Sequence, residues 1–107
     1  MLRCEAVRWV SDDPFPGWLE VTFTDADGHL WKVFDKPPVF GNSVELKRDA
    51  PFPVAVELDC EILTVDRRPD QDLVTISTLT PWGLSTEDGR SEFTVFAWQL
   101  IQGVATS

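Results

Sequence analysis

The chain has 107 residues, of which 43% are hydrophobic, including five tryptophans and seven phenylalanines. This apolar content suffices for one domain whose packed core needs neither a metal ion nor a disulfide, and it excludes a disordered chain. The formal net charge of −9, from 18 acidic and nine basic side chains, opposes binding to nucleic acid or to a membrane surface, because both depend on basic side chains.

We expect the protein to act in the cytoplasm. Residues 1–5 lead directly into strand-like sequence and not into the apolar stretch of a signal peptide. No run of the chain approaches the roughly 20 apolar residues of a membrane span. Cys4 and Cys60 are then expected to be reduced, buried thiols.

Residues 3–10 carry β-branched and aromatic side chains and predict the first strand. Prolines within residues 11–16 end it, because each proline disfavours regular structure and removes a backbone donor. Residues 17–35 then predict a β-hairpin, the clearest signal in the chain. Its first strand alternates apolar and polar side chains over residues 19–24, and an Asp-Gly pair follows.

The turn of this hairpin decides its register. A two-residue Asp-Gly loop would pair Phe23 with Lys32, whereas a three-residue loop over residues 26–28 pairs Phe23 with Trp31. The second register collects the apolar side chains on one face, and a slip of one residue would scatter them. We therefore predict the three-residue loop. It pairs Phe23 with Trp31, Val21 with Val33 and Thr22 with Lys32.

Further strands follow the hairpin. Residues 42–48 predict a short strand, and residues 54–65 predict the longest one, with alternate apolar side chains on one face. At Leu63 and Val65 the other face becomes apolar, which indicates a bend or a change of environment. The last two predicted strands are 73–79 and 92–101, the second with an alternative helical turn near its end.

Six or seven short strands, frequent Pro and Gly, and no long helix predict an all-β fold. A long strand that changes its buried face midway is typical of a strand that curves around a barrel and contributes to both halves. We predict a small, partly closed, mostly antiparallel β-barrel, with a β-sandwich as the alternative. It forms a single domain over residues 1–107, of which residues 103–107 are expected to fray.

An acidic row on the long strand is the first candidate for a functional surface. Glu57, Asp59 and Glu61 alternate along it, so their carboxylates are expected on one face at intervals of about 6.6 to 6.8 Å. Such a strip suits a basic partner or a shared cation. The alternative is a solvated strand face whose charges deter edge-to-edge pairing.

The second candidate is the polar loop between the last two strands. Trp82 lies between proline and glycine, which restrict its conformation, so it is suited to anchor a partner at low entropic cost. Glu87 and Asp88 follow it in the same loop. The alternative is that Trp82 and Trp18 close the ends of the barrel.

Motifs for catalysis or metal binding are weak. Residues 25–28 resemble the start of a calcium loop, but its twelfth position is Lys36, so they are interpreted as a turn. His29 is expected on the hairpin surface without a nucleophile beside it. The paired acids Asp12-Asp13 and Glu87-Asp88 leave open a small hydrolase. No cofactor is predicted.

The leading hypothesis is a non-enzymatic, acidic protein-interaction domain, of the inhibitor or immunity type, that binds a basic protein partner. In size and acidity, though not by any motif, the chain is similar to the bacterial immunity proteins that neutralise basic toxins. The alternatives are a barrel that binds a small ligand or a metal, and the small hydrolase. The residues expected to bind the partner are Glu57, Asp59, Glu61, Trp82, Glu87 and Asp88.

Overall fold

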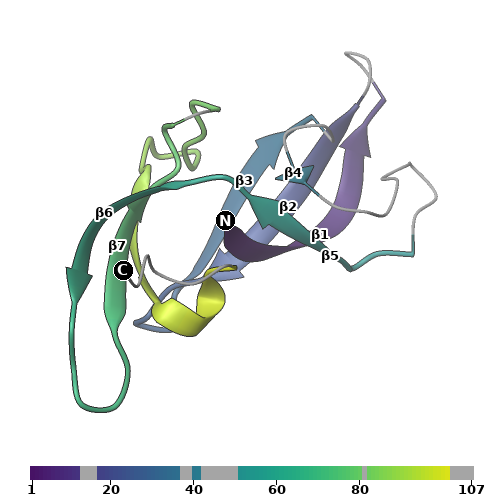
Figure 1. Ribbon diagram of the computed structural model, residues 1–107. Coiled ribbons are helices and arrows are strands. Elements are labelled where there is room, and N and C mark those ends of the chain that lie inside the picture. The colour runs from purple at the N-terminus through teal and green to yellow at the C-terminus, as the bar shows by residue number, and fades with distance from the viewer. Residues whose placement is uncertain (13–16, 37–39, 42–50, 81, 102–107) are drawn as a thin grey trace.

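The computed structural model describes residues 1–12, 17–36, 40–41, 51–80 and 82–101. Its strands form two antiparallel sheets, one of five strands and one of three (Figure 1). In spatial order, the five-stranded sheet consists of β3 (Leu30–Asp35), β2 (Trp18–Thr24), β1 (Leu2–Ser11), β5 (Val54–Leu58) and the two-residue β4 (Phe40–Gly41). The three-stranded sheet consists of β6 (Glu61–Asp66), β7 (Leu73–Ser77) and β8 (Glu92–Phe96).

The β2–β3 hairpin has the predicted register. Phe23 lies opposite Trp31, Val21 opposite Val33 and Thr22 opposite Lys32, which confirms the three-residue loop. The N–H of Asp25 donates to the carbonyl of His29 at 2.9 Å, and the N–H of Gly28 donates to the carbonyl of Asp25 at 3.0 Å. Gly28 has a φ of 83°, the left-handed conformation that this turn requires and that glycine adopts without strain.

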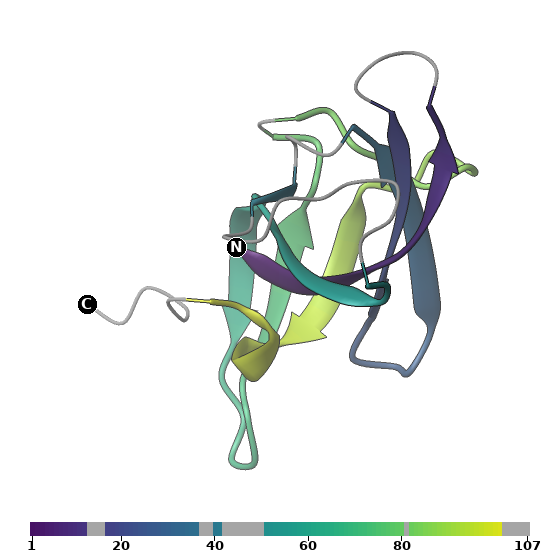
Figure 2. The same cartoon turned by 90° about the vertical axis from the view of Figure 1, so that its right-hand side faces the viewer.

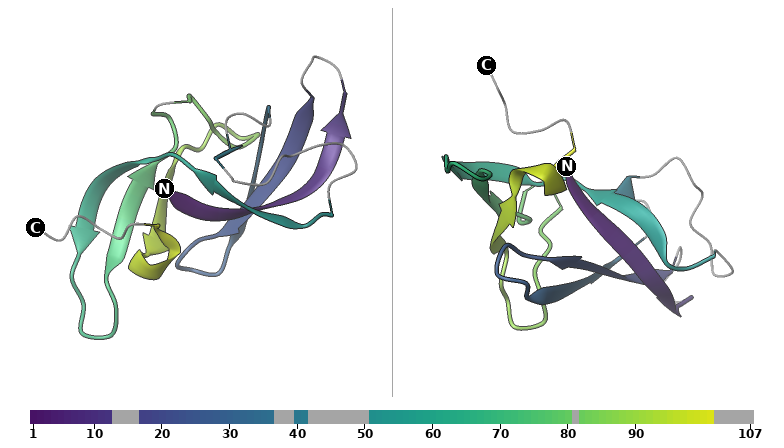
Figure 3. Two further views of the ribbon diagram at one scale, coloured as in Figure 1. Left: turned by 45° about the vertical axis from the view of Figure 1, so that its right-hand side comes forward. Right: turned by 90° about the horizontal axis from the view of Figure 1, so that it is seen from below.

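The predicted long strand over residues 54–65 is two strands in two different sheets. β5 ends at Leu58, Asp59 and Cys60 interrupt the pairing, and β6 begins at Glu61. The chain continues from β5 into β6 as one arc (Figure 3). A shift in register between Ile62 and Thr64 adds a bulge. The interruption and the bulge explain why the apolar face changes in this segment.

The all-β class and the antiparallel pairing are confirmed, but the closure into a barrel is not. Among the described strands, β3 and β4 form the edges of the first sheet, and β6 and β8 form those of the second. An isolated bridge pairs Leu2 of β1 with Leu100, which lies beyond the end of β8. The turn of the β2–β3 hairpin also lies beside β8 (Figure 2), where the N–H of Ala26 donates to the carbonyl of Thr94 at 2.8 Å.

The core lies between the two sheets. Phe93 of β8 is 1% exposed and contacts the Phe23 ring edge-on, with a centroid distance of 4.9 Å. It also contacts the Trp31 ring at 5.3 Å. One aromatic side chain of the second sheet therefore packs against both strands of the hairpin. Fully buried aliphatic side chains come from both sheets and include Leu2, Leu19, Val21, Val33, Leu58, Val74, Ile76 and Val95.

Three tryptophans, Trp9, Trp31 and Trp98, lie in segments predicted as strands, a position that predicts core side chains, but they differ in burial. Trp9 and Trp31 pack against the core while remaining partly exposed, but Trp98 is 65% exposed, so its placement in the core was wrong. The reason is local: β8 ends at Phe96, and a single 3-10 turn (Ala97–Gln99) directs the Trp98 side chain outward. Within the described ranges, no helix has the length and apolar content needed to cross a bilayer.

Both cysteines are free thiols, but Cys60 is only partly buried and not buried as predicted. Cys4 is buried, and its thiol donates to the carbonyl of Leu2 with a distance of 3.6 Å between sulfur and oxygen. Burial, with a smaller contribution from nearby Cys60, raises the pKa of Cys4. Its thiol therefore stays protonated at neutral pH. The predicted strand over residues 42–48 and the predicted fraying of residues 103–107 lie outside the described residues.

We expect Gly17→Ala to destabilise the fold more than Gly89→Ala. Gly17 has a φ of 112°, and a methyl group there would overlap the indole ring of Trp9. Gly89 has a φ of 86° with open space around it, so only backbone strain applies. The expected losses of unfolding free energy are about 3 kcal/mol and about 1 kcal/mol. Urea denaturation followed by tryptophan emission measures both, and equal losses would contradict the contact with Trp9.

Candidate functional site

Asp59 and Trp82, two of the six predicted binding residues, lie in contact although 23 positions separate them in the chain. The indole Nε1–H of Trp82 donates to Oδ2 of Asp59 at 3.3 Å. Asp59 lies in the interruption between β5 and β6, and Trp82 lies in the connection between β7 and β8. The change of sheet after β5 therefore places the carboxylate where the loop indole reaches it.

The Trp82 side chain is held at the surface and not in the core. It is 46% exposed, and Leu79, three positions before it in the chain, is 58% exposed. The N–H of Gly83 donates to the carbonyl of Leu79 at 2.7 Å and closes this turn. Asp59, Leu79 and Trp82 together form the Asp59–Trp82 surface. Its exposure does not fit the alternative in which Trp82 closes one end of the fold.

Glu57 and Glu61 lie on either side of Asp59 in the chain but on different sheets. Glu57 belongs to β5 and lies opposite Arg3 of β1, while Glu61 opens β6 opposite Ser77. The regular row of three carboxylates on one strand face was therefore wrong, because the pairing stops between them. Of the three, Asp59 is the one in contact with Trp82.

Glu87 and Asp88 occupy a tight turn elsewhere in the β7–β8 connection. The N–H of Thr86 donates to the carbonyl of Arg90 at 2.8 Å, and the hydroxyl of Thr86 donates to the carboxylate of Asp88. This hydrogen bond lowers the pKa of Asp88, despite a small opposing effect of desolvation. Asp88 is therefore fully ionised at neutral pH.

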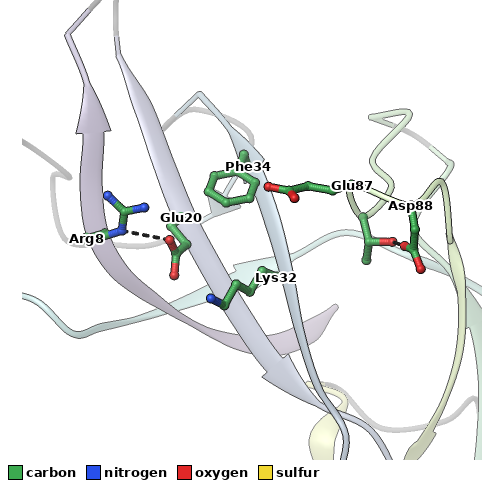
Figure 4. Close-up of a pocket in the computed structure, with 7 residues that line it drawn as sticks. Arg8, Glu20, Lys32, Phe34, Glu87 and Asp88 are labelled. Carbon is green, nitrogen blue, oxygen red and sulfur yellow. Dashed lines mark hydrogen bonds and ion pairs between the residues drawn. The ribbon is translucent and has the colours of Figure 1, made fainter.

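The same turn borders an open hollow of about 440 Å³ on the face of the β1–β2–β3 strands (Figure 4). Glu87 reaches from the turn toward the ring of Phe34, while the carboxylate of Asp88 faces Thr86. The two neighbouring acids do not point at a common centre, as a catalytic pair would. We call this feature the mixed-charge hollow; it is lined by Arg8, Glu20, Lys32, Phe34, Thr86, Glu87 and Asp88.

The floor of the hollow follows from strand register. Arg8 of β1 lies opposite Glu20 of β2, which lies opposite Phe34 of β3. Nε of Arg8 donates to Oε1 of Glu20 at 2.8 Å. The Glu20 side chain is only 10% exposed and that of Arg8 is 59% exposed. Lys32 lies diagonally across from Glu20, a spacing within reach of long side chains.

Sequence reasoning missed the four strand residues of this hollow. The predicted hairpin register already placed Phe34 on the face away from the core, opposite Glu20. Arg8 could not be placed, because the pairing of β1 with β2 contains register shifts at Val7 and Val10. Such shifts cannot be recognised from the alternation of apolar and polar residues along the strand.

Asp25 holds the hairpin turn together. Both of its carboxylate oxygens accept hydrogen bonds from within the hairpin. The ring of His29 contacts that of Trp31 with a centroid distance of 4.1 Å and an interplanar angle of 43°. In the part of the chain that the structure describes, no three potential ligands gather into a metal site.

Two surface features contain predicted binding residues, one around an exposed indole and one around a mixed set of charges. The six predicted residues divide between them: Asp59 and Trp82 in the first, Glu87 and Asp88 in the second, with Glu57 and Glu61 beside the first in the chain. No protein-family model, curated protein or solved structure matches the chain.

Proposed function

We propose that the protein is a non-enzymatic interaction domain that binds a basic protein partner through the Asp59–Trp82 surface. The observation that carries the proposal is the exposed Trp82 indole, oriented by its hydrogen bond to the Asp59 carboxylate. Large aromatic side chains that are exposed before binding and buried after it dominate the binding energy of many interfaces.

The hydrogen bond to Asp59 serves such an anchor in two ways. It restricts the rotamers of the indole, which lowers the entropy lost on binding. It also leaves a carboxylate beside the ring, where a basic side chain of the partner can pair with it. The exposed Leu79, whose carbonyl accepts from Gly83 in the same turn, adds apolar area near Trp82 in the chain.

The charge of the whole chain supports a basic partner. A net charge of −9 speeds the encounter with a positively charged protein and discourages acidic ones. Glu57 and Glu61 add negative charge in the segments on either side of Asp59. These charges steer the approach, whereas the indole supplies the contact area.

Affinity capture from the native cell, compared between variants, tests the proposal. Trp82→Ala is expected to lose a basic partner that the wild type retains, since loss of an anchoring indole costs about 2 kcal/mol or more. Asp59→Asn keeps an oxygen that accepts the indole N–H but removes the negative charge. It therefore separates the effect of orienting the Trp82 indole from the effect of the Asp59 charge. It is expected to weaken capture at low salt and to have little effect at high salt.

Trp98→Ala is the matched control, because it also removes an exposed indole. Trp98 follows β8 and stacks on Phe96, and it is not part of the Asp59–Trp82 surface. It is expected to retain the partner. Equal capture by wild type and Trp82→Ala, or equal loss with Trp98→Ala, would contradict the proposal.

A further inference from the structure

We infer that the mixed-charge hollow receives an arginine side chain of the basic partner. This inference rests on the proposed function, since it assigns part of the partner's chemistry. It concerns Glu87 and the strand residues opposite it, away from the Asp59–Trp82 contact. The hollow is lined by three carboxylates, two basic side chains, one phenyl ring and the side chain of Thr86.

The balance of charge around the hollow favours one additional cation. Arg8 and Lys32 carry two positive charges, and Glu20, Glu87 and Asp88 carry three negative ones. Arg8 already pairs with Glu20, and Asp88 accepts its hydrogen bond from Thr86. Among the interactions of the described residues, neither the Glu87 carboxylate nor the Lys32 ammonium has an ion pair, and Glu87 lies beside Phe34 (Figure 4).

The phenyl ring of Phe34 selects the kind of cation. A guanidinium is planar and weakly hydrated, so it stacks on an aromatic face while its N–H groups pair with a carboxylate at its edge. Phe34 and Glu87 offer this combination. The molecule contains one such ring contact already, where the Arg90 guanidinium lies 4.6 Å from the centre of the Trp31 ring and its Nε donates to the backbone carbonyl of Glu92. An ammonium, a compact and strongly hydrated charge, gains less from stacking.

Titration with N-acetyl-arginine amide, followed by ¹⁵N–¹H NMR, tests the inference without any partner. This probe carries one guanidinium and no terminal charges. We expect saturable shifts with a dissociation constant on the order of 10 mM, as suits a single side chain in an open site. The shifted amides should be those of Arg8, Glu20, Phe34 and Glu87. N-acetyl-norleucine amide, uncharged and similar in length, should produce no saturable shifts there.

Variants with opposite expected signs sharpen the test. Glu87→Gln should weaken binding of the probe about threefold to fivefold, because it removes the pairing carboxylate. Lys32→Gln should tighten it about twofold, because it removes a repelling charge on the same face. Asp70→Asn in the β6–β7 turn removes one negative charge, as Glu87→Gln does, but outside the hollow, so it should leave the affinity for the probe unchanged. Retained spectral dispersion in each variant shows that the fold is intact.

Three results would overturn the inference: no saturable shift, the same weakening by Asp70→Asn as by Glu87→Gln, or equal affinity for N-acetyl-lysine amide at matched ionic strength. The first two results would show that the hollow does not bind the probe. The third would show that it does not prefer a guanidinium to an ammonium. None of them affects the capture that depends on Trp82, so failure here is distinguishable from failure of the proposed function.

Discussion

Phe93→Ala is expected to cost about 3–5 kcal/mol of unfolding free energy, the usual range for truncation of a buried phenylalanine. Phe93 is 1% exposed, and its ring joins β8 to the hairpin through contacts with Phe23 and Trp31. Truncation would leave a cavity between the two sheets, which share no continuous strand ladder there. For a chain of this size, such a loss is a large share of a total stability of about 5–15 kcal/mol.

Urea denaturation monitored by tryptophan emission measures this effect, with Phe96→Ala as the control. Phe96 is also in β8 but is only partly buried and stacks on the exposed Trp98 at 6.2 Å. Its truncation should cost about 1 kcal/mol. If both variants lost the same free energy, the packing of Phe93 between the sheets would be wrong.

Asp25→Ala is expected to cost about 2–3 kcal/mol, because three N–H groups lose a charged acceptor. Oδ1 of Asp25 accepts from the N–H of Asp27 at 2.9 Å and of His29 at 3.0 Å. Oδ2 accepts from the indole Nε1–H of Trp31 at 2.7 Å. Asp27→Ala, in the same turn with an exposed side chain, should change stability by less than about 0.5 kcal/mol. A loss of unfolding free energy no larger than that of Asp27→Ala would contradict this role, because it would show that water accepts the three N–H groups equally well.

The Asp25 interactions also predict how stability depends on pH. Burial acts to raise the pKa of Asp25, but hydrogen bonds from Trp31, His29 and Asp27, with the charge of His29, outweigh it and lower the pKa. The folded pKa therefore lies below the unfolded value of about 3.9. The stabilisation is fully present above that value and is lost as the pH falls through the folded pKa. The difference in stability between wild type and Asp25→Asn should shrink below about pH 4, and a constant difference would contradict this linkage.

The fold was largely predictable where local chemistry and apolar alternation agree. In the β2–β3 hairpin, only one register places the apolar side chains on one face and also puts glycine where the turn needs a positive φ. Both requirements are local, so the sequence alone determined the pairing of Phe23 with Trp31. The division of residues 54–65 between two sheets was visible only as a change of face near Leu63.

The candidate site was predictable only in part, because it depends on contacts between distant segments. Trp82 and Asp59 were each identified, but their contact follows from the change of sheet after Leu58, which alternation cannot place. The mixed-charge hollow needs the register of β1 against β2, which shifts at two points. Arg8 and Glu20 are 12 positions apart and look like ordinary surface charges in the sequence.

The decisive measurement is the affinity of the captured partner for wild type and for Trp82→Ala, determined by calorimetry at two salt concentrations. If the Trp82 indole anchors the partner, binding to Trp82→Ala is at least about thirtyfold weaker at both concentrations. Binding to the wild type is also weaker at the higher salt concentration. Equal dissociation constants for the two proteins would show that the partner binds elsewhere and would contradict the proposed function.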